Sequence, residues 1–105
     1  QEEKVFKLTN NSCDYVGEDH VSRNEVIAFD GYVGGGYAIP TEGMMSAVKL
    51  MARKEAILLD PVYTGKAFAG LVDLVQKRHF KKTDKILFIH TGGSAAFPAF
   101  EWAFK

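Results

Sequence analysis

The sequence predicts an α/β fold, in which helices flank a parallel β-sheet. Three short and unbroken apolar runs, at residues 26–29, 56–59 and 86–89, carry this prediction. Runs of this kind are typical of strands that are buried on both faces of a parallel sheet. The stretches between them have helical periodicity and are long enough for the crossovers that join parallel strands.

The first third of the chain combines a weak helix, a strand and a loop. Apolar residues within positions 5–16 loosely follow helical spacing, and Gly17 stands where a left-handed C-cap would end a short or frayed helix. The run 26–29 (VIAF) is too short for a helix and is rich in strand-forming residues. Residues 31–37 contain four glycines in seven positions, which predicts a loop.

A helix is predicted after Pro40, with Thr41 as its N-cap. The apolar residues that follow recur at the spacing i, i+3, i+4 and i+7, which places them on one face of a helix. They are Met44, Met45, Ala47, Val48, Met51 and Ala52. We interpret the methionines among them as core residues and not as part of a cofactor site.

A second strand and a second main helix follow. The run 56–59 is interpreted as a buried strand that ends at Asp60 and Pro61, because proline cannot donate to a strand ladder. The next helix is expected to begin near Thr64. It precedes a basic cluster between residues 77 and 82, and basic side chains are favourable near the C-terminal end of a helix dipole.

The third predicted strand, 86–89, leads through residues 91–93 into a last helix over 95–104. A sheet of three strands leaves two long edges, and a chain of this length buries only about 60–65% of its surface on folding. The sequence contains no repeat and no linker. We therefore expect residues 1–105 to be the incomplete C-terminal segment of a larger α/β domain.

Composition and charge exclude several classes of function. The 13 basic and 13 acidic residues balance, and no basic run marks a surface for nucleic acid. No apolar run approaches the roughly 18 residues that cross a bilayer, so no membrane contact is expected. The three histidines and Cys13 stand at no metal-ligand spacing, so we predict no metal site. A single cysteine cannot form an internal disulfide, which suits a cytoplasmic protein.

Three polar loops follow the predicted strands, at residues 34–40, 60–66 and 90–93. In open parallel sheets, ligands bind beside the carboxyl ends of the strands. The loops are therefore candidates for a single small-ligand site before any family is considered.

The sequences of these loops resemble one family of enzymes. The stretches GGYAIP, LLDPVYTGKAFAGLVDLV and ILFIHTGG resemble, in order and spacing, the C-terminal part of the D-cysteine desulfhydrases and aminocyclopropane-carboxylate deaminases. The resemblance covers roughly residues 25–105. Its most specific element is DPVYTGKA, because a continuous run of defined residues is rarely matched by chance.

The resemblance implies a pyridoxal-phosphate enzyme of fold type II, in which this chain belongs to the larger, tryptophan synthase β-like domain. Relatives of this kind are usually homodimers and act on small amino acids. Their cofactor-binding lysine and phosphate loop lie upstream of every segment present in this sequence. We therefore expect the 105-residue chain alone to be inactive and to bind no cofactor covalently.

The resemblance also implies roles for four residues. Tyr63 and Tyr37 are the implied catalytic residues, which hold the substrate and handle a proton near its Cα and leaving group. Thr91 and Thr64 are the implied cofactor-binding residues, and the Thr91 hydroxyl is expected to bind the pyridine nitrogen. One departure from the family is Ala38, next to Tyr37, which stands where many relatives have glycine.

The two threonines favour one branch of the family. Deaminases carry glutamate at the position of Thr64 and typically lack a threonine at the position of Thr91, whereas desulfhydrases carry threonine at both. The resemblance therefore implies a β-elimination lyase that converts D-cysteine to pyruvate, ammonia and sulfide. Aminocyclopropane-carboxylate deamination is the alternative within the family, and a non-catalytic binding module is the alternative outside it.

Each candidate residue also has a structural interpretation. Tyr63 can be a tyrosine at the rim of the fold, and the hydroxyls of Thr64 and Thr91 can cap helices, a role that we favour for Thr64. Lys66 is expected to be solvated. His90 is expected to be a packed and hydrogen-bonded imidazole, and not a base.

Overall fold

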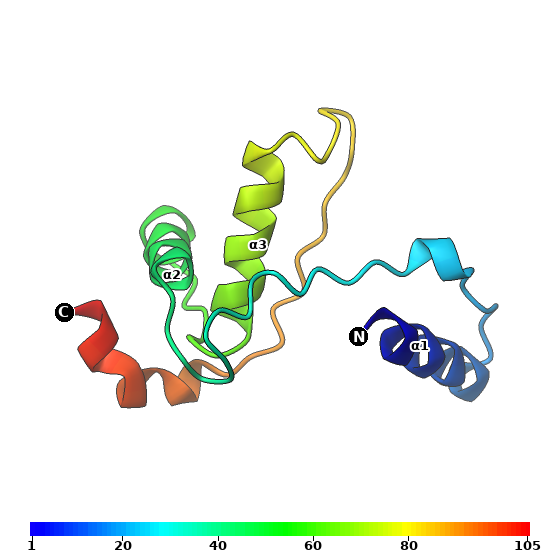
Figure 1. Ribbon diagram of the computed structural model, residues 1–105, viewed down its shortest axis with the longest axis horizontal. Helices are drawn as coiled ribbons and strands as arrows, with labels where there is room; N and C mark the ends of the chain where they lie inside the picture. The colour runs from blue at the N-terminus through cyan, green and yellow to red at the C-terminus, as the bar shows by residue number, and fades with distance from the viewer. The chain divides into compact units, whose positions relative to one another are not determined.

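The computed structural model describes all residues from 1 to 105, which form two compact units, Gln1–Asp30 and Gly31–Lys105 (Figure 1). The regular elements are, in order, α1 (Glu2–Val16), the 3₁₀-helix η1 (Arg23–Glu25), α2 (Glu42–Glu55), α3 (Thr64–Gln76) and the 3₁₀-helix η2 (Ser94–Phe104). None of the helices combines the length and the apolar character that crossing a membrane requires.

All of the regular structure is helical, so the predicted α/β fold with a parallel sheet is wrong. The three apolar runs form no strands, and the backbone hydrogen bonds outside the helices join only residues close in sequence, in turns and helix caps. A strand requires a ladder of hydrogen bonds to a neighbouring strand, which an apolar run cannot supply by itself. Each run has side chains that are exposed, among them Ile27, Ile57 and Leu87, although Leu59 is buried.

Polar side chains hold the first unit together. α1 ends at Gly17 with φ 76°, so the predicted left-handed C-cap is confirmed. The Asn10 side chain accepts a hydrogen bond from the Val21 amide (2.9 Å) and donates one to the Val21 carbonyl (3.3 Å). Arg23 forms an ion pair with Glu2 (2.9 Å). No residue of this unit is buried, so the unit has no apolar core of its own.

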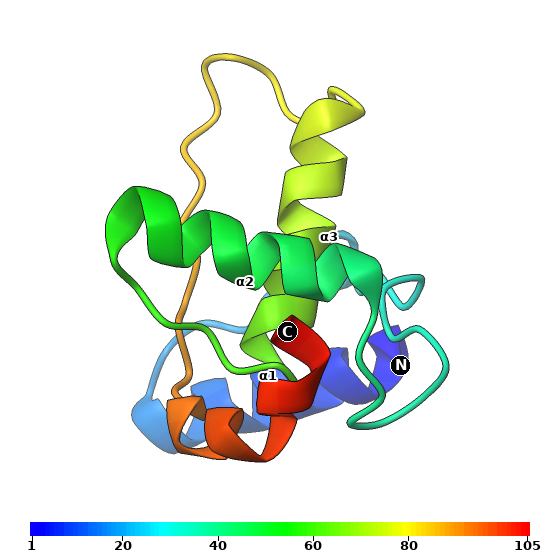
Figure 2. The same cartoon turned by 90° about the vertical axis from the view of Figure 1, so that its left-hand side faces the viewer.

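The second unit is built on α2 and α3, whose axes cross steeply. α2 is seen almost end-on in Figure 1 and lengthwise in Figure 2, while α3 stands upright in both. Thr41 caps α2 as predicted, since its hydroxyl oxygen accepts a hydrogen bond from the Met44 amide (3.2 Å). α3 begins at Thr64, also as predicted.

A small apolar cluster lies where these two helices meet, and it consists of Met44, Val48 and Leu59. Met45 and Met51 pack against the cluster, so the prediction that the methionines are core residues is confirmed. Gly65 permits the close approach of α3. A Cβ atom at this position would lie 2.6 Å from the carbonyl oxygen of Asp60 and 2.8 Å from Val48 Cγ2.

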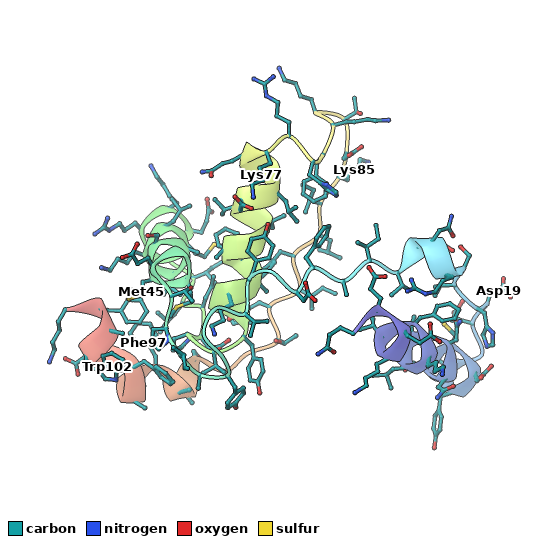
Figure 3. The ribbon with its side chains drawn as sticks, viewed as in Figure 1. Asp19, Met45, Lys77, Lys85, Phe97 and Trp102 are labelled. Carbon is teal, nitrogen blue, oxygen red and sulfur yellow. The ribbon has the colours of Figure 1, made fainter.

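The helix predicted over residues 95–104 is confirmed as η2, and it is a 3₁₀-helix. Gly93 is its N-cap, with φ 90°, and Pro98 lies inside it, where proline removes a backbone donor. Phe97 and Phe104 pack against the apolar cluster with their ring centroids 4.8 Å apart. Figure 3 shows Phe97 close to Met45, at the side of α2 that faces η2.

Candidate active site

A buried carboxylate organises the start of α3. Asp60 is 1% exposed, and it accepts hydrogen bonds from the backbone amides of Val62 (2.8 Å), Tyr63 (2.7 Å) and Thr64 (2.7 Å). The N-terminus of a helix leaves such amides without partners in the helix itself. Burial alone would raise the pKa of the Asp60 carboxyl. The hydrogen bonds from the Thr64 hydroxyl and the three amides outweigh burial and hold this pKa below its usual range.

The Thr64 hydroxyl is bound to the same aspartate. It donates to Asp60 Oδ2 (2.5 Å) and accepts from the Asp60 amide (2.8 Å), and the residue is buried. Thr64 is the first residue of α3, so it supports the helix start through Asp60 and is not the N-cap itself. Because a hydroxyl has one proton, this group has none left to donate to a ligand in this arrangement.

The two predicted catalytic tyrosines lie together. Tyr63 is the N-cap residue of α3, and Tyr37 lies in the glycine-rich loop. The Tyr63 hydroxyl donates to the Tyr37 hydroxyl oxygen (3.1 Å), and the rings meet edge to face with their centroids 5.8 Å apart. Both side chains are exposed. The hydrogen bond to Tyr37 raises the pKa of Tyr63 above its usual value.

Lys66 is buried, so the expectation that it is solvated is wrong. It is 7% exposed, and its Nζ donates to the carbonyl oxygens of Val33 (2.5 Å) and Gly36 (2.8 Å). Both carbonyls belong to the glycine-rich loop that carries Tyr37. The loop packs over the lysine and excludes water from it, which local sequence could not reveal.

The third predicted loop meets the segment before α3. His90 Nδ1 accepts a hydrogen bond from the Gly92 amide (3.0 Å), so in a neutral ring the proton lies on Nε2, which faces the Leu58 carbonyl oxygen at 3.1 Å. His90 is hydrogen-bonded as predicted, but its side chain is exposed, so the expectation that it is packed is wrong. Gly93 lies against Asp60, since a Cβ atom at Gly93 would be 2.9 Å from Asp60 Cγ.

Thr91 lies between these two contacts. Its side chain is exposed, and its hydroxyl forms no hydrogen bond with the rest of the chain. The N-cap of η2 is Gly93, so Thr91 does not serve as a helix cap. Its hydroxyl is therefore available to a ligand, in contrast to that of Thr64.

The first and third predicted loops thus both contact the second, which lies within the segment from Leu58 to Lys66, although no sheet aligns the three. Sequence comparison matches residues 2–92 to the family described as pyridoxal-phosphate dependent enzyme. The chain belongs to this family. The match includes all four candidate residues, and pyridoxal phosphate is the cofactor of pyridoxal-phosphate dependent enzymes.

The side chains around the start of α3 fit part of a pyridoxal-phosphate site. The free hydroxyl of Thr91 can donate to a pyridine nitrogen, whereas the Thr64 proton is bound to Asp60. Lys66 is not available as a covalent ligand in this arrangement, because it is buried and its Nζ binds two carbonyl oxygens. Of these three side chains, only that of Thr91 is therefore exposed and has a polar hydrogen free for a ligand.

Two residues that shape the site, Asp60 and Lys66, have no functional role in the sequence prediction. An aspartate shortly before a predicted helix start is a common capping signal, so the contribution of Asp60 could have been recognised. The contact of Lys66 with Gly36 joins positions 30 residues apart and leaves no local signature.

Proposed function

We propose that this chain is part of a pyridoxal-phosphate dependent lyase that, when intact, eliminates sulfide from D-cysteine, with pyruvate and ammonia as the other products after uptake of water. The Tyr37–Tyr63 hydroxyl pair carries the proposal, because it presents two exposed phenols at one point of the structure. The sequence DPVYTGKA supports the resemblance to the family as a whole, and the threonines at positions 64 and 91 favour its desulfhydrase branch over its deaminase branch.

The two phenols have different roles in this proposal. Pyridoxal phosphate, when bound, supplies an electron sink that makes the Cα proton of an amino acid acidic. Tyr63 is protonated at neutral pH, as a phenol is, so it serves as a proton donor and not as a base. Its proton passes to the departing sulfur when its hydrogen bond to Tyr37 breaks. Tyr37 accepts the hydrogen bond from Tyr63, which leaves its own proton free to bind the substrate carboxylate.

Thr91 is the proposed partner of the pyridine nitrogen. A hydroxyl is a neutral partner and strengthens the electron sink less than a carboxylate would. This suits elimination of sulfide, because thiolate is a good leaving group. The homodimer that the family resemblance implies is part of the same proposal, and analytical ultracentrifugation of the protein tests it.

Tyr63→Phe in the intact enzyme that contains this segment, loaded with pyridoxal phosphate, tests the proposed function. Removing the hydroxyl is expected to lower kcat on D-cysteine by about 10²–10⁴-fold, while cofactor occupancy stays unchanged. Sulfide release per bound cofactor is the measurement. Tyr15→Phe is the matched control, since Tyr15 lies on α1 and is 96% exposed.

Two results would contradict the proposal. Turnover of Tyr63→Phe within about twofold of the parent would show that Tyr63 only lines the site. A parent protein with a higher kcat/KM on aminocyclopropane carboxylate than on D-cysteine would assign it to the deaminase branch.

A further inference from the structure

We propose that Lys66 is a positioning residue, whose buried ammonium group holds the glycine-rich loop so that the Tyr37 hydroxyl meets the Tyr63 hydroxyl. The use of this tyrosine pair in catalysis rests on the proposed function. The assembly of the pair rests on the contacts of Lys66 alone, and the two can be tested separately.

The two hydrogen bonds of Lys66 span a single turn of the loop. Nζ donates to the carbonyl oxygens of Val33 and Gly36, which lie on either side of the turn, and Tyr37 follows Gly36 directly. The Gly36 carbonyl also accepts from the Ile39 amide (3.4 Å). Tyr37 therefore lies between two backbone groups that are hydrogen-bonded, the Gly36 carbonyl and the Ile39 amide.

The only hydrogen-bond acceptors of the Lys66 ammonium group are the two carbonyl oxygens of this loop. The side chain is 7% exposed, and none of the ion pairs of the chain includes it. A buried ammonium group without hydrogen-bond acceptors is strongly unfavourable. If the loop moved away, the ammonium group would lose both carbonyls, so the position of the loop and the burial of the cation are coupled.

The start of the loop is also anchored, because the Tyr32 hydroxyl donates to Asp73 Oδ2 (2.6 Å), but the turn between Val33 and Gly36 is bound to α3 through Lys66. Gly34 (φ 71°), Gly36 (φ 146°) and Ala38 (φ 57°) all have positive φ angles. A glycine-rich segment has many alternative conformations when unconstrained. Positive φ at a residue with a Cβ, as at Ala38, persists only where surrounding contacts hold it.

Lys66 and Tyr63 belong to the same rigid start of α3. They are three positions apart, and the Tyr63 carbonyl accepts the first α-helical hydrogen bond, from the Ala67 amide (2.9 Å). Residues at this spacing are neighbours on a helix surface. One helix end therefore supplies both the phenol and the cation that holds the loop with the second phenol.

A pH titration of the tyrosine ring signals by NMR, with isotope-labelled tyrosine Cζ atoms, tests this inference. Lys66→Met removes the donors and keeps the length of the side chain. It is expected to return the pKa of Tyr63 toward 10.0, because the hydrogen bond to Tyr37 is lost. Lys66→Arg keeps donors and is expected to retain the raised pKa. Lys54→Met, at an exposed lysine of α2, is the matched control and is expected to match the parent.

Catalysis provides the second measurement. In the intact enzyme that contains this segment, loaded with pyridoxal phosphate, we expect Lys66→Met to lower kcat/KM on D-cysteine by about 10²-fold, since misplacement by about 1 Å has effects of that size. We expect Lys66→Arg to restore a large part of the loss, and Lys54→Met to leave the rate unchanged.

A folded Lys66→Met protein that keeps the raised pKa of Tyr63 would overturn the inference, as would Met and Arg variants that behave alike. Should Lys66→Met not fold, Lys66→Gln replaces it with the same expected result, because its shorter side chain cannot reach both carbonyls. If neither folds, Lys66 serves the stability of the fold and the inference is wrong. The NMR result is independent of the proposed function, because it stands even if Tyr63→Phe leaves turnover intact.

Discussion

Each unit of this chain has polar contacts within it, and buried side chains make such contacts only in the second unit. In Gln1–Asp30 the ion pair between Arg23 and Glu2 joins side chains that are 45% and 42% exposed, and water competes for both partners. In Gly31–Lys105 the aspartate and lysine that organise the candidate site are 1% and 7% exposed. Removing one partner of a buried contact leaves the other with no hydrogen-bond partner, either from water or from the protein.

This difference explains why the candidate site lies in the second unit. Exposed polar contacts can open and close at little cost in free energy, so they define the position of a side chain poorly. Buried contacts hold their partners in one arrangement because every alternative leaves a polar group unsatisfied. The Tyr37–Tyr63 pair is exposed itself, but Asp60 and Lys66 beneath it are not.

Asp60→Ala is expected to have the largest effect on stability. It leaves three backbone amides and the Thr64 hydroxyl without their acceptor, and one unsatisfied buried group costs about 1–3 kcal/mol. We expect the free energy of unfolding of the second unit to fall by roughly 3 kcal/mol. Urea denaturation and faster amide hydrogen exchange in α3 are the measurements.

Glu2→Ala is the matched change in the first unit. It removes a carboxylate that binds Arg23 and accepts from the Ala28 amide (3.2 Å). Because this carboxylate is exposed, hydrogen exchange in α3 should stay as in the parent, and the midpoint of unfolding should barely move. Equal losses from Glu2→Ala and Asp60→Ala would contradict the distinction between the two units.

Gly65→Ala is expected to have the next largest effect. The added methyl group would meet the Asp60 carbonyl oxygen at 2.6 Å and Val48 Cγ2 at 2.8 Å, and overpacking of this kind costs about 1–3 kcal/mol. Gly43→Ala on α2 is the control, since the nearest atom to its new methyl group is Ala69 Cβ at 4.0 Å. Thermal unfolding should show a loss for Gly65→Ala and a gain of up to about 1 kcal/mol for Gly43→Ala. A neutral Gly65→Ala would mean that α3 does not approach the cluster this closely.

Acid should weaken the second unit through Asp60, with a smaller effect than Asp60→Ala because a protonated carboxyl still accepts hydrogen bonds. The pKa of Asp60 is lower in the folded protein than the ordinary value of 3.8. Its contribution to stability is therefore complete above pH 3.8 and is lost as the pH falls below 3.8 through the folded pKa. The measurement is the free energy of unfolding of the parent and of Asp60→Asn over this pH range. Asp73 also has a lowered pKa, because Lys77 and Tyr32 bind it, and the comparison separates the contribution of Asp60 from that of Asp73. Identical pH dependence in the two proteins would show that the carboxylate is not stabilised in the folded state.

The smallest expected effect concerns two alanines with almost the same backbone conformation. Ala38 (φ 57°) and Ala56 (φ 56°) are both left-handed, which costs about 1–2 kcal/mol for a residue with a Cβ. Ala38→Gly and Ala56→Gly should each stabilise the protein by less than about 1 kcal/mol, since glycine also gains freedom in the unfolded chain. Only Ala38→Gly, next to Tyr37, should change the tyrosine NMR signals. If Ala56→Gly, at the C-cap of α2, changed them too, the effect would not be local.

Helix boundaries could be predicted from the sequence because their signals are local. Thr41 caps α2 through an amide three residues away, and Gly17 ends α1 through its own backbone conformation. The start of α3 at Thr64 is of the same kind. The predicted strands are different, because a strand exists only through hydrogen bonds to a neighbour elsewhere in the chain, and these runs have none.

The sequence by itself determined the family, through the match over residues 2–92, together with the starts of α2 and α3. Only the tertiary structure decided which polar side chains are buried. Thr64 and Thr91 are the same residue type in similar loops, yet one hydroxyl is bound to Asp60 and the other is free. Lys66 is a basic residue like those near the end of α3, but the glycine-rich loop that packs over it comes from 30 positions earlier in the chain. Burial depends on contacts between distant segments, and local sequence does not encode such contacts.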